Sequence, residues 1–318
     1  MQNIMKCGII GCGNVGATTA YRLMISGLFN EIVLIDIDKK RAIGEAEDIA
    51  HGIPFNSPVE IYAGDYKDLR NAGIVIITAG VSQKQGETRI DLVGRNTKVF
   101  SNIVENLSHS GFDGIILVVT NPVDILTYVT IAFSKFDRKK VIGSGTVLDT
   151  ARLKQLMGNN LKVDARNIHT FILGEHGDSE LPVWSSANIS GIDISSYCTE
   201  RASYCNSETL DSIFFKVREA AYNIIDAKGA TYYAIAEAVN RIVSAIVRDE
   251  HTILPVSAYL NGEYGIRDVC LGIPCVLGAN GVEEVLEIPL SEHEMNKLLY
   301  SASIMHSTLD NLKIKASV

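Results

Sequence analysis

The sequence predicts an α/β protein that begins with an open, doubly wound parallel sheet and continues into an α+β region with antiparallel strands. Over the first half of the chain, short β-branched runs alternate with helical stretches, as in βαβ units whose sheet is buried on both faces. The second half instead contains a long helical stripe followed by strand runs that meet at turns. A chain of 318 residues is long enough for two packed units. We therefore expect two domains, residues 1–143 and residues 144–318.

Five strands are predicted in the first region. They are Lys6 to Ile10, Glu31 to Asp36, Ile74 to Thr78, Ile115 to Thr120 and Lys140 to Gly143. Between two of them, Val99, Ile103 and Leu107 recur at helical spacing and predict an amphipathic helix. The alternation of strand and helix is what favours a parallel sheet.

The second region has its own signals. A hydrophobic stripe over residues 235–246 predicts a long helix. The strand runs that follow turn at Asn261-Gly262 and near Gly278 to Gly281, which predicts antiparallel strands. Ser291 stands three residues before Glu294 in the pattern of a capping box, so we expect the last helix to begin there.

Composition excludes several classes of partner. The formal net charge of -8 comes without a long basic stretch, so we expect no nucleic-acid or membrane-surface partner. The start of the chain lacks the features of a signal peptide, and the apolar runs are too short to span a bilayer. The six cysteines, at positions 7, 12, 198, 205, 270 and 275, show no metal-ligand spacing. These observations predict a cytoplasmic protein with reduced thiols and no bound metal.

A dinucleotide site is predicted at "GCGNVG", Gly11 to Gly16, which follows the first strand and opens a helix. Glycines at its first, third and sixth positions permit a tight turn, close approach of the backbone to a pyrophosphate, and helix packing on the strand. Alone the motif is equally explained as a structural turn. Asp36 adds a carboxylate twenty residues after Gly16, where it can accept hydrogen bonds from ribose hydroxyls. It would repel a 2′-phosphate, so NAD is favoured over NADP.

Four stretches carry candidates for chemistry. They are "QKQGETR" with Gln83 and Arg89, "TNPVD" with Asn121, "GTVLDTAR" with Asp149 and Arg152, and "GEHGD" with His176. Taken singly, each of the first three stretches also has a purely structural explanation. The first could be a surface loop, the second a turn, and the third an ion pair between residues three apart on a helix. A histidine, a carboxylate to orient it, two arginines and an NAD site together indicate hydride transfer to a small 2-oxo acid.

The sequence resembles the L-lactate dehydrogenases, bacterial type, of the lactate/malate dehydrogenase family. The resemblance runs nearly end to end through "GCGNVG", "TAG", "QGETR", "TNPVD", "GSG", "LDTAR", "GEHGDSELPVWS" and "KGAT". It implies a Rossmann-type first domain and a reversible transfer of hydride between NADH and pyruvate that gives L-lactate. A protein that binds NAD without catalysis is the alternative of a different class, but it would not need His176, Asp149, Arg89 and Arg152 together.

The resemblance also implies roles for individual residues. His176 is the proton donor and acceptor, Asp149 orients it, Arg152 anchors the substrate carboxylate, and Arg89 polarises the carbonyl from a mobile loop. Asn121 and Thr231 correspond to residues that line the substrate and nicotinamide pocket. The implied cofactor-binding set comprises Gly11, Gly13, Val15, Gly16, Asp36, Thr78, Gly80, Asn121 and Ser144.

Gln83 carries the expectation about substrate choice. Malate dehydrogenases of the family have an arginine six residues before the loop arginine, where it pairs with the second carboxylate of oxaloacetate. A neutral Gln83 leaves that carboxylate without a partner, which favours pyruvate. Lys84 is adjacent and offers partial compensation, so malate remains the alternative substrate, together with larger 2-hydroxy acids.

At Lys154 and His169 the resemblance also implies a binding site for an effector. In bacterial members, an arginine and a histidine at these positions bind fructose 1,6-bisphosphate at a subunit interface, and the family is typically tetrameric. Here the first position is Lys154, which keeps the cation but loses the bidentate geometry of arginine. The sequence therefore predicts an activator site and a homo-oligomer, against the alternative of a surface lysine and a partly buried histidine.

Overall fold

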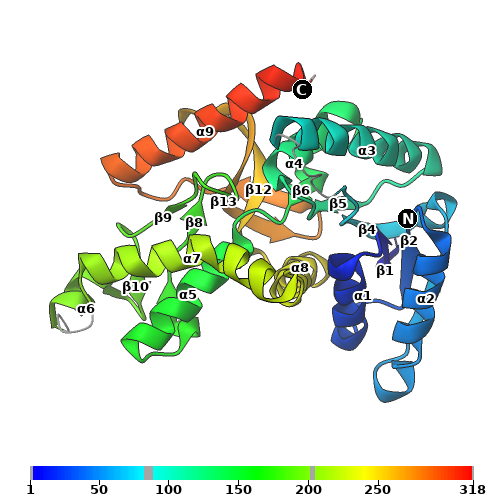
Figure 1. The fold of residues 1–318 in the computed structure, drawn as a ribbon, viewed down its shortest axis with the longest axis horizontal. Helices are drawn as coiled ribbons and strands as arrows, with labels where there is room; N and C mark the ends of the chain where they lie inside the picture. Colours follow the sequence, from blue (N-terminus) through cyan, green and yellow to red (C-terminus); the bar gives the residue numbers. More distant parts are fainter. Residues whose placement is uncertain (1–2, 82–88, 201–204, 317–318) are drawn as a thin grey trace.

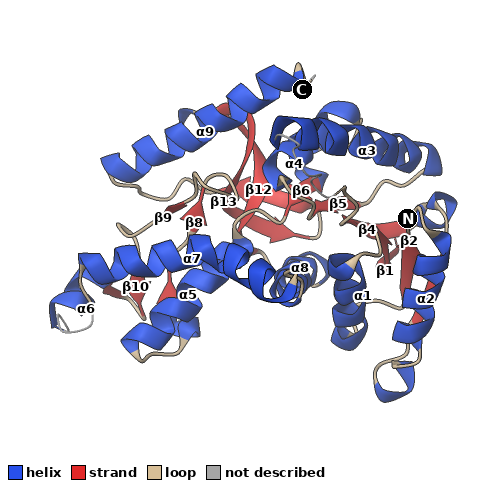
Figure 2. Cartoon of the chain, viewed as in Figure 1, coloured by secondary structure: helices blue, strands red, loops and turns tan. Residues whose placement is uncertain are grey.

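The computed structural model of the chain describes residues 3–81, 89–200 and 205–316. Its centre is a sheet of nine strands in the order β14-β13-β12-β6-β5-β4-β1-β2-β3 (Figures 1 and 2). The strands are Asn3–Ile10 (β1), Glu31–Ile35 (β2), Glu60–Ala63 (β3), Ala72–Ile77 (β4), Ile115–Val118 (β5), Val141–Gly143 (β6), Thr252–Asn261 (β12), Arg267–Gly278 (β13) and Gly281–Val285 (β14). The five strands expected in the first region all form, with ends that differ by a few residues, and β3 was not predicted.

Two kinds of pairing meet in this sheet. Strands β1 to β6 run parallel, in the order 3-2-1-4-5-6 of a doubly wound nucleotide-binding sheet. Strands β12, β13 and β14 are antiparallel, as their turn residues predict, and β12 joins the parallel part through Ser257 opposite Gly143. The sheet thus runs across the domain boundary that we predict at residue 143.

Helices cover both faces of the sheet (Figure 1). The helices are Asn14–Ser26 (α1), Lys39–Ala50 (α2), Arg89–Ser110 (α3), Val123–Phe133 (α4), Val147–Leu161 (α5), Ile194–Glu200 (α6), Ser207–Lys228 (α7), Tyr233–Val247 (α8) and Glu292–Leu312 (α9). One hydrophobic cluster lies under α3, α4 and α9, and another lies under α1, α2 and α8. The expected capping box forms at the start of α9, between Ser291 and Glu294.

A smaller unit packs beside the sheet around α5 and α7. It contains the short strands Ile168–His169 (β7), Asn188–Ile189 (β10) and Ile192–Asp193 (β11), and a third hydrophobic cluster fills its interior. The two-stranded pair Ile172–Leu173 (β8) and Leu181–Pro182 (β9) connects this unit to β13. The turn between β8 and β9 contains the "GEHGD" segment and therefore lies at the junction of the two units.

The cysteines differ from the expectation in one respect. Cys198 of α6 and Cys205 before α7 form a disulfide, because the packing of these segments on the third cluster brings their Cα atoms to 4.7 Å. The expectation of reduced thiols is therefore wrong for this pair. The other four cysteines are free and buried, and burial raises the pKa of each thiol.

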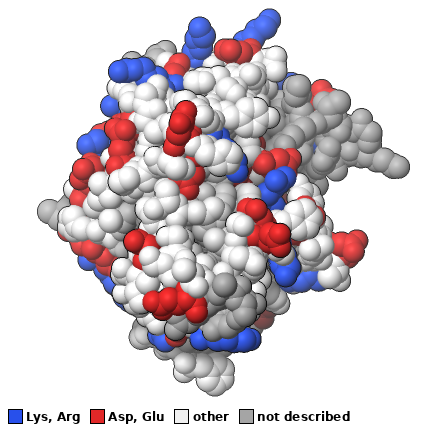
Figure 3. Space-filling model, turned by 90° about the vertical axis from the view of Figure 1, so that its left-hand side faces the viewer, with Lys and Arg blue, Asp and Glu red and all other residues white. Residues whose placement is uncertain are grey.

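Charged side chains of both signs are mixed on the face of the molecule seen in Figure 3. On the face seen in Figure 3, Lys and Arg side chains are interspersed with Asp and Glu side chains, and the described residues form no continuous basic patch there. None of the helices in the described ranges has both the length and the hydropathy needed to cross a membrane.

The turn from β1 into α1 depends on close backbone packing. Gly11 has a φ of 100°, a backbone conformation that residues with a side chain rarely adopt. A Cβ placed on Gly16 would lie 1.9 Å from the carbonyl oxygen of Gly11. Thr78 closes the turn from the neighbouring strand, since its hydroxyl donates to the same oxygen at 2.7 Å. The helix can approach the strand this closely only with glycine at position 16.

We expect Gly16→Ala to lower the melting temperature, because the added methyl must displace backbone and such overpacking costs about 1–3 kcal/mol. Gly44→Ala is the matched control: Gly44 lies in α2, and its added Cβ would meet no atom within 4 Å. A helical glycine replaced by alanine in open space should stabilise by about 0.5–1 kcal/mol. Thermal unfolding measures both. Equal melting temperatures for the two variants would contradict the packing argument.

Candidate active site

Four of the polar residues that the sequence singles out converge on one cavity of about 500 Å³. Its walls include Asn121 after β5, Asp149 and Arg152 of α5, and His176 in the turn between β8 and β9. The first turn of α3 and one face of α7 complete the lining. Ligands of open α/β sheets bind outside the carboxyl ends of the strands, and Asn121 marks that edge here.

Asp149 is the central group of this cavity. Its carboxylate is 2% exposed and is contacted from two sides, by His176 Nδ1 at Oδ2 (2.5 Å) and by the Arg152 guanidinium at Oδ1 (2.9 Å). The spacing of three residues on α5 places Asp149 and Arg152 on the same helix face, as expected. The ion pair between Asp149 and Arg152, which was the purely structural explanation of the motif, therefore forms. His176 is part of the same network of charges.

The ion pair sets the protonation of His176. Burial lowers the pKa of this histidine, but the charge and the hydrogen bond of Asp149 outweigh burial and raise it to about 9. In turn His176 and Arg152 hold the pKa of the Asp149 carboxyl below its ordinary value, against the effect of burial. The ring is therefore an imidazolium at neutral pH, with Nδ1 held by Asp149 and Nε2 left to donate a proton.

A second buried carboxylate fixes the backbone of the histidine turn. The N–H of His176 donates to Asp124 Oδ2 at 2.8 Å, and the hydroxyl of Ser257 on β12 donates to Oδ1 at 2.5 Å. Burial raises the pKa of Asp124 to about 6, and these hydrogen bonds limit the rise. Asp124 belongs to the "TNPVD" motif, but its role depends on contacts with residues far away in the sequence, so the motif alone did not reveal it.

The glycine turn presents an anion site next to the sheet edge. Gly13 is the N-cap residue of α1 and has no side chain to cap the helix, so the first N–H groups of α1 remain available to a ligand. Asp36 follows β2 and is oriented by the N–H groups of Cys12 (2.6 Å) and Asp38 (2.9 Å). Each carboxylate oxygen keeps a lone pair for a ribose hydroxyl. The donor set and the close approach at Gly16 fit a dinucleotide.

Comparisons with known proteins agree with this geometry. A family model described as lactate/malate dehydrogenase, NAD binding domain, matches residues 5–143, and one described as lactate/malate dehydrogenase, alpha/beta C-terminal domain, matches residues 146–315. The chain belongs to the lactate/malate dehydrogenase family. The anion site at the start of α1 is accordingly that of an NAD-binding domain, and NAD is the cofactor.

Individual relatives in this family cover nearly the whole chain. An L-lactate dehydrogenase of Acetivibrio thermocellus is 55% identical over 98% of both chains, and one of a Thermoanaerobacter species is 53% identical over 97% of this chain and 99% of the relative. Among solved structures, a lactate dehydrogenase from a Medee basin deep-sea metagenome library shares 46% identity with a TM-score of 0.96, over 98% of this chain and 100% of that one. A ligand-bound minor L-lactate dehydrogenase from Enterococcus mundtii shares 43% identity with a TM-score of 0.94, over 96% and 98%.

Several predicted site residues are not brought to the cavity by the described structure. Gln83 and the neighbouring Lys84 lie outside the described residues, and Arg89 begins α3 with a side chain that is not described. Thr231 lies between α7 and α8 and is not among the described residues that line the cavity. The family roles of Gln83, Arg89 and Thr231, and the compensation offered by Lys84, remain predictions.

The structure places the other predicted positions as follows. Val15 lies in the first turn of α1, Thr78 and Gly80 follow β4, and Ser144 follows β6. Lys154 is half-buried on α5, and His169 is exposed on β7, an element that packs on α5. Neither Lys154 nor His169 is among the described residues that line the cavity of His176. The roles of these residues remain predictions.

The sequence reasoning missed a buried acid of the cavity. Glu180 is buried beside the ion pair, and one ligand atom each from Asp149, His176 and Glu180 lie within 4.8 Å of one another. Such a trio has the residue types of a metal site. Both oxygens of Asp149 are already engaged by Arg152 and His176, so the geometry is that of an ion pair. Glu180 occurs in the quoted "GEHGDSELPVWS" segment, but nothing in its spacing indicated that it points inward.

We expect the reduction of a 2-oxo acid to lose rate as pH rises through about 9, because His176 then loses the proton that it must donate. Asp149→Asn removes the group that raises this pKa, so the loss should move to clearly lower pH. His176→Ala should reduce kcat by about 100-fold or more while NADH still binds. Steady-state rates and NADH fluorescence titration check these outcomes. An unchanged pH profile in Asp149→Asn, or equal loss of turnover and NADH binding in His176→Ala, would refute the assignment.

Proposed function

We propose that this chain is an NAD-dependent L-lactate dehydrogenase that interconverts pyruvate and L-lactate. One observation carries the proposal: a charged histidine, aligned by a buried carboxylate and accompanied by a half-buried arginine, lines a cavity beside the cofactor edge of the sheet. The near full-length relatives named L-lactate dehydrogenase support the same substrate. The residues at the start of α1, together with Asp36, would hold NADH, which would supply a hydride to the carbonyl carbon when bound.

The protein groups then have separate tasks. As negative charge grows on the carbonyl oxygen, His176 donates its Nε2 proton, and Asp149 stabilises the imidazolium before transfer. One guanidinium nitrogen of Arg152 donates to Asp149. The remaining N–H donors of the guanidinium can bind the substrate carboxylate. In the reverse direction the neutral ring accepts the proton of the lactate hydroxyl. Hydride, proton and charge are thereby balanced in both directions.

The remaining family roles belong to the same proposal. Arg89 would polarise the carbonyl, while Asn121 and Thr231 would contact the substrate and the nicotinamide. The cofactor would be held by Gly11, Gly13, Val15, Gly16, Asp36, Thr78, Gly80, Asn121 and Ser144. We also place the enzyme in the cytoplasm, in a glycolytic or fermentative role in which pyruvate reduction regenerates NAD, and we propose 1–143 and 144–318 as its two domains.

The assay for the proposed reaction follows NADH oxidation at about 340 nm with pyruvate and, separately, with oxaloacetate. We expect a larger kcat/KM for pyruvate, because Gln83 offers no charge to a second carboxylate. Gln83→Arg should shift the ratio towards oxaloacetate by at least about 100-fold, since an unpaired buried carboxylate costs several kcal/mol. A preference of the unmodified enzyme for oxaloacetate would make it a malate dehydrogenase. NADH binding without turnover of any 2-oxo acid would remove the enzymatic proposal altogether.

An effector site at Lys154 and His169 is the finer part of the proposal, with fructose 1,6-bisphosphate as activator and a homotetramer as the active assembly. The half-buried ammonium of Lys154 and the exposed ring of His169 are on neighbouring elements. Burial lowers the pKa of Lys154, which a phosphate would oppose by favouring its charged form.

We expect the bisphosphate to lower the KM for pyruvate and to favour the tetramer, and we expect Lys154→Met and His169→Gln each to weaken this response. Exposed Lys297 of α9 provides the control, because Lys297→Met also removes one positive charge. Initial rates and sedimentation velocity, with and without the bisphosphate, are the measurements. If the bisphosphate changes neither rate nor assembly of the unmodified enzyme, the effector site is withdrawn.

A further inference from the structure

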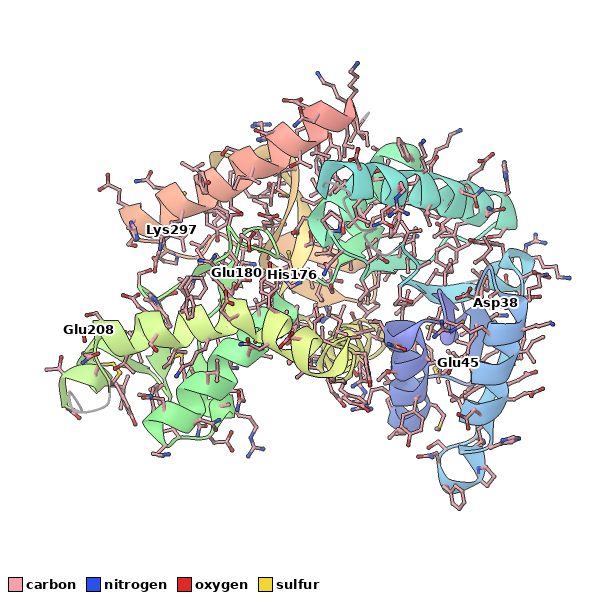
Figure 4. The ribbon with its side chains drawn as sticks, viewed as in Figure 1. Asp38, Glu45, His176, Glu180, Glu208 and Lys297 are labelled. Atoms are coloured by element: carbon pink, nitrogen blue, oxygen red, sulfur yellow. A yellow bond between two sulfur atoms is a disulfide. The ribbon has the colours of Figure 1, made fainter. Side chains whose placement is uncertain are left out.

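Glu180 is a buried acid in the cavity that the proposed mechanism does not use. It lies in the turn before β9, it is 8% exposed, and Figure 4 shows it beside His176. In the described part of the chain, its side chain has no hydrogen bond and no ion pair. The other buried carboxylates of this region do have such contacts: Ser179 donates to Glu175, and Ser257 donates to Asp124. Its carboxyl faces the cavity, and a group with so little access to water is costly when it is ionised without a partner.

Charged side chains face Glu180 from each of the elements that surround it. Asp149 and Arg152 project from α5, and Arg218 projects from α7, where Tyr222 also lines the cavity. His176 and Asp178 belong to the turn that contains Glu180. Burial and the negative charge of Asp149 raise the pKa of Glu180 well above its ordinary value, against the opposing effect of the cations. The carboxyl therefore changes its charge at a higher pH than an exposed glutamate.

The net charge of the cavity depends on whether the Glu180 carboxyl carries its proton. Among the described residues, the cavity is lined by three cations, His176, Arg152 and Arg218, and by the carboxyl groups of Asp149, Asp178 and Glu180. With Glu180 neutral, these groups together carry one net positive charge, which a single substrate carboxylate neutralises. With Glu180 ionised, they are already neutral, and the substrate would bring a net negative charge into the cavity. The carboxylate of Glu180 would also compete with the substrate for the field of Arg152.

We propose that Glu180 determines substrate affinity through its protonation state: the neutral carboxyl admits the carboxylate of the 2-oxo acid, and the ionised carboxyl opposes it. Substrate binding is thereby coupled to uptake of one proton from solvent, which converts the Glu180 carboxylate to the acid. This inference rests on the proposed function, because it requires an anionic substrate at Arg152. Glu180 acts on affinity and takes no part in the transfer of hydride or proton to the carbonyl.

The first test is the KM for pyruvate between about pH 5 and pH 7.5 at saturating NADH, more than about one pH unit below the pKa of His176. The unmodified enzyme should show a KM that rises with pH, by up to about 10-fold per pH unit above the pKa of Glu180, with little change in kcat. Glu180→Gln should show a flat KM over the same range. Exposed Glu208, at the far end of α7 in Figure 4, provides the control: Glu208→Gln removes the same charge and should keep the rising profile.

The second test counts protons directly. Oxamate, an unreactive amide analogue of pyruvate, is titrated into the NADH complex by calorimetry in two buffers with different ionisation enthalpies. In the pH range where KM rises, the unmodified enzyme should take up more protons than Glu180→Gln. A purely structural role of Glu180 would lower affinity or stability equally at every pH and would leave proton uptake unchanged.

The outcomes separate the two proposals. If pyruvate is not reduced at any pH, the proposed function fails. If it is reduced, but the unmodified enzyme and Glu180→Gln share one KM profile and one proton count, the inference about Glu180 is overturned alone. Should Glu180→Gln fail to fold, Glu180→Ala also removes the acid: a flat KM in that variant supports the inference, and a KM that follows the unmodified profile overturns it.

Discussion

The active-site geometry depends on one carboxylate that serves two cations. Asp149 is buried, so its charge would be very unfavourable without partners, and removing one partner of a buried pair typically costs about 3–5 kcal/mol. Both partners are also the groups that the proposed chemistry needs: His176 with a raised pKa and Arg152 in a fixed orientation. Stability and the proposed catalysis therefore place the same demand on α5, namely that it presents Asp149 and Arg152 on one face towards the histidine turn.

That demand is met only because distant parts of the chain support the histidine turn. Asp124 at the start of α4 accepts the backbone N–H of His176, and Ser257 of β12 holds the other oxygen of Asp124. Asp124 lies on α4, directly after the parallel strand β5, Ser257 lies on an antiparallel strand, and His176 lies in the turn at the junction with the small unit. The antiparallel strands thus extend the sheet and also supply a hydroxyl that positions the histidine turn, which explains why Ser257 is polar within a buried strand.

Local pattern allowed much of this molecule to be predicted. The parallel strands, the hairpin turns and the capping box of α9 all depend on neighbours in sequence, and they form as expected. The pairing of Asp149 with Arg152 is also local, because helical spacing alone puts them on one face. The roles of Asp124 and Glu180, and the disulfide between Cys198 and Cys205, depend on tertiary packing. No spacing rule indicates which of several acidic residues in a motif is turned into the core, or which cysteines become neighbours.

The two cations of the site are also coupled through the acid that they share. When the carboxylate of a substrate engages Arg152 in the proposed mechanism, part of the positive field that this arginine exerts on Asp149 is neutralised. Asp149 then interacts more strongly with His176, and the proton affinity of the imidazole rises with it. A bound anion therefore helps to keep the histidine charged until the carbonyl oxygen becomes basic enough to take the proton. Because the ion pair is buried, water screens this coupling little, and an exposed arrangement of the same three residues would lose most of it.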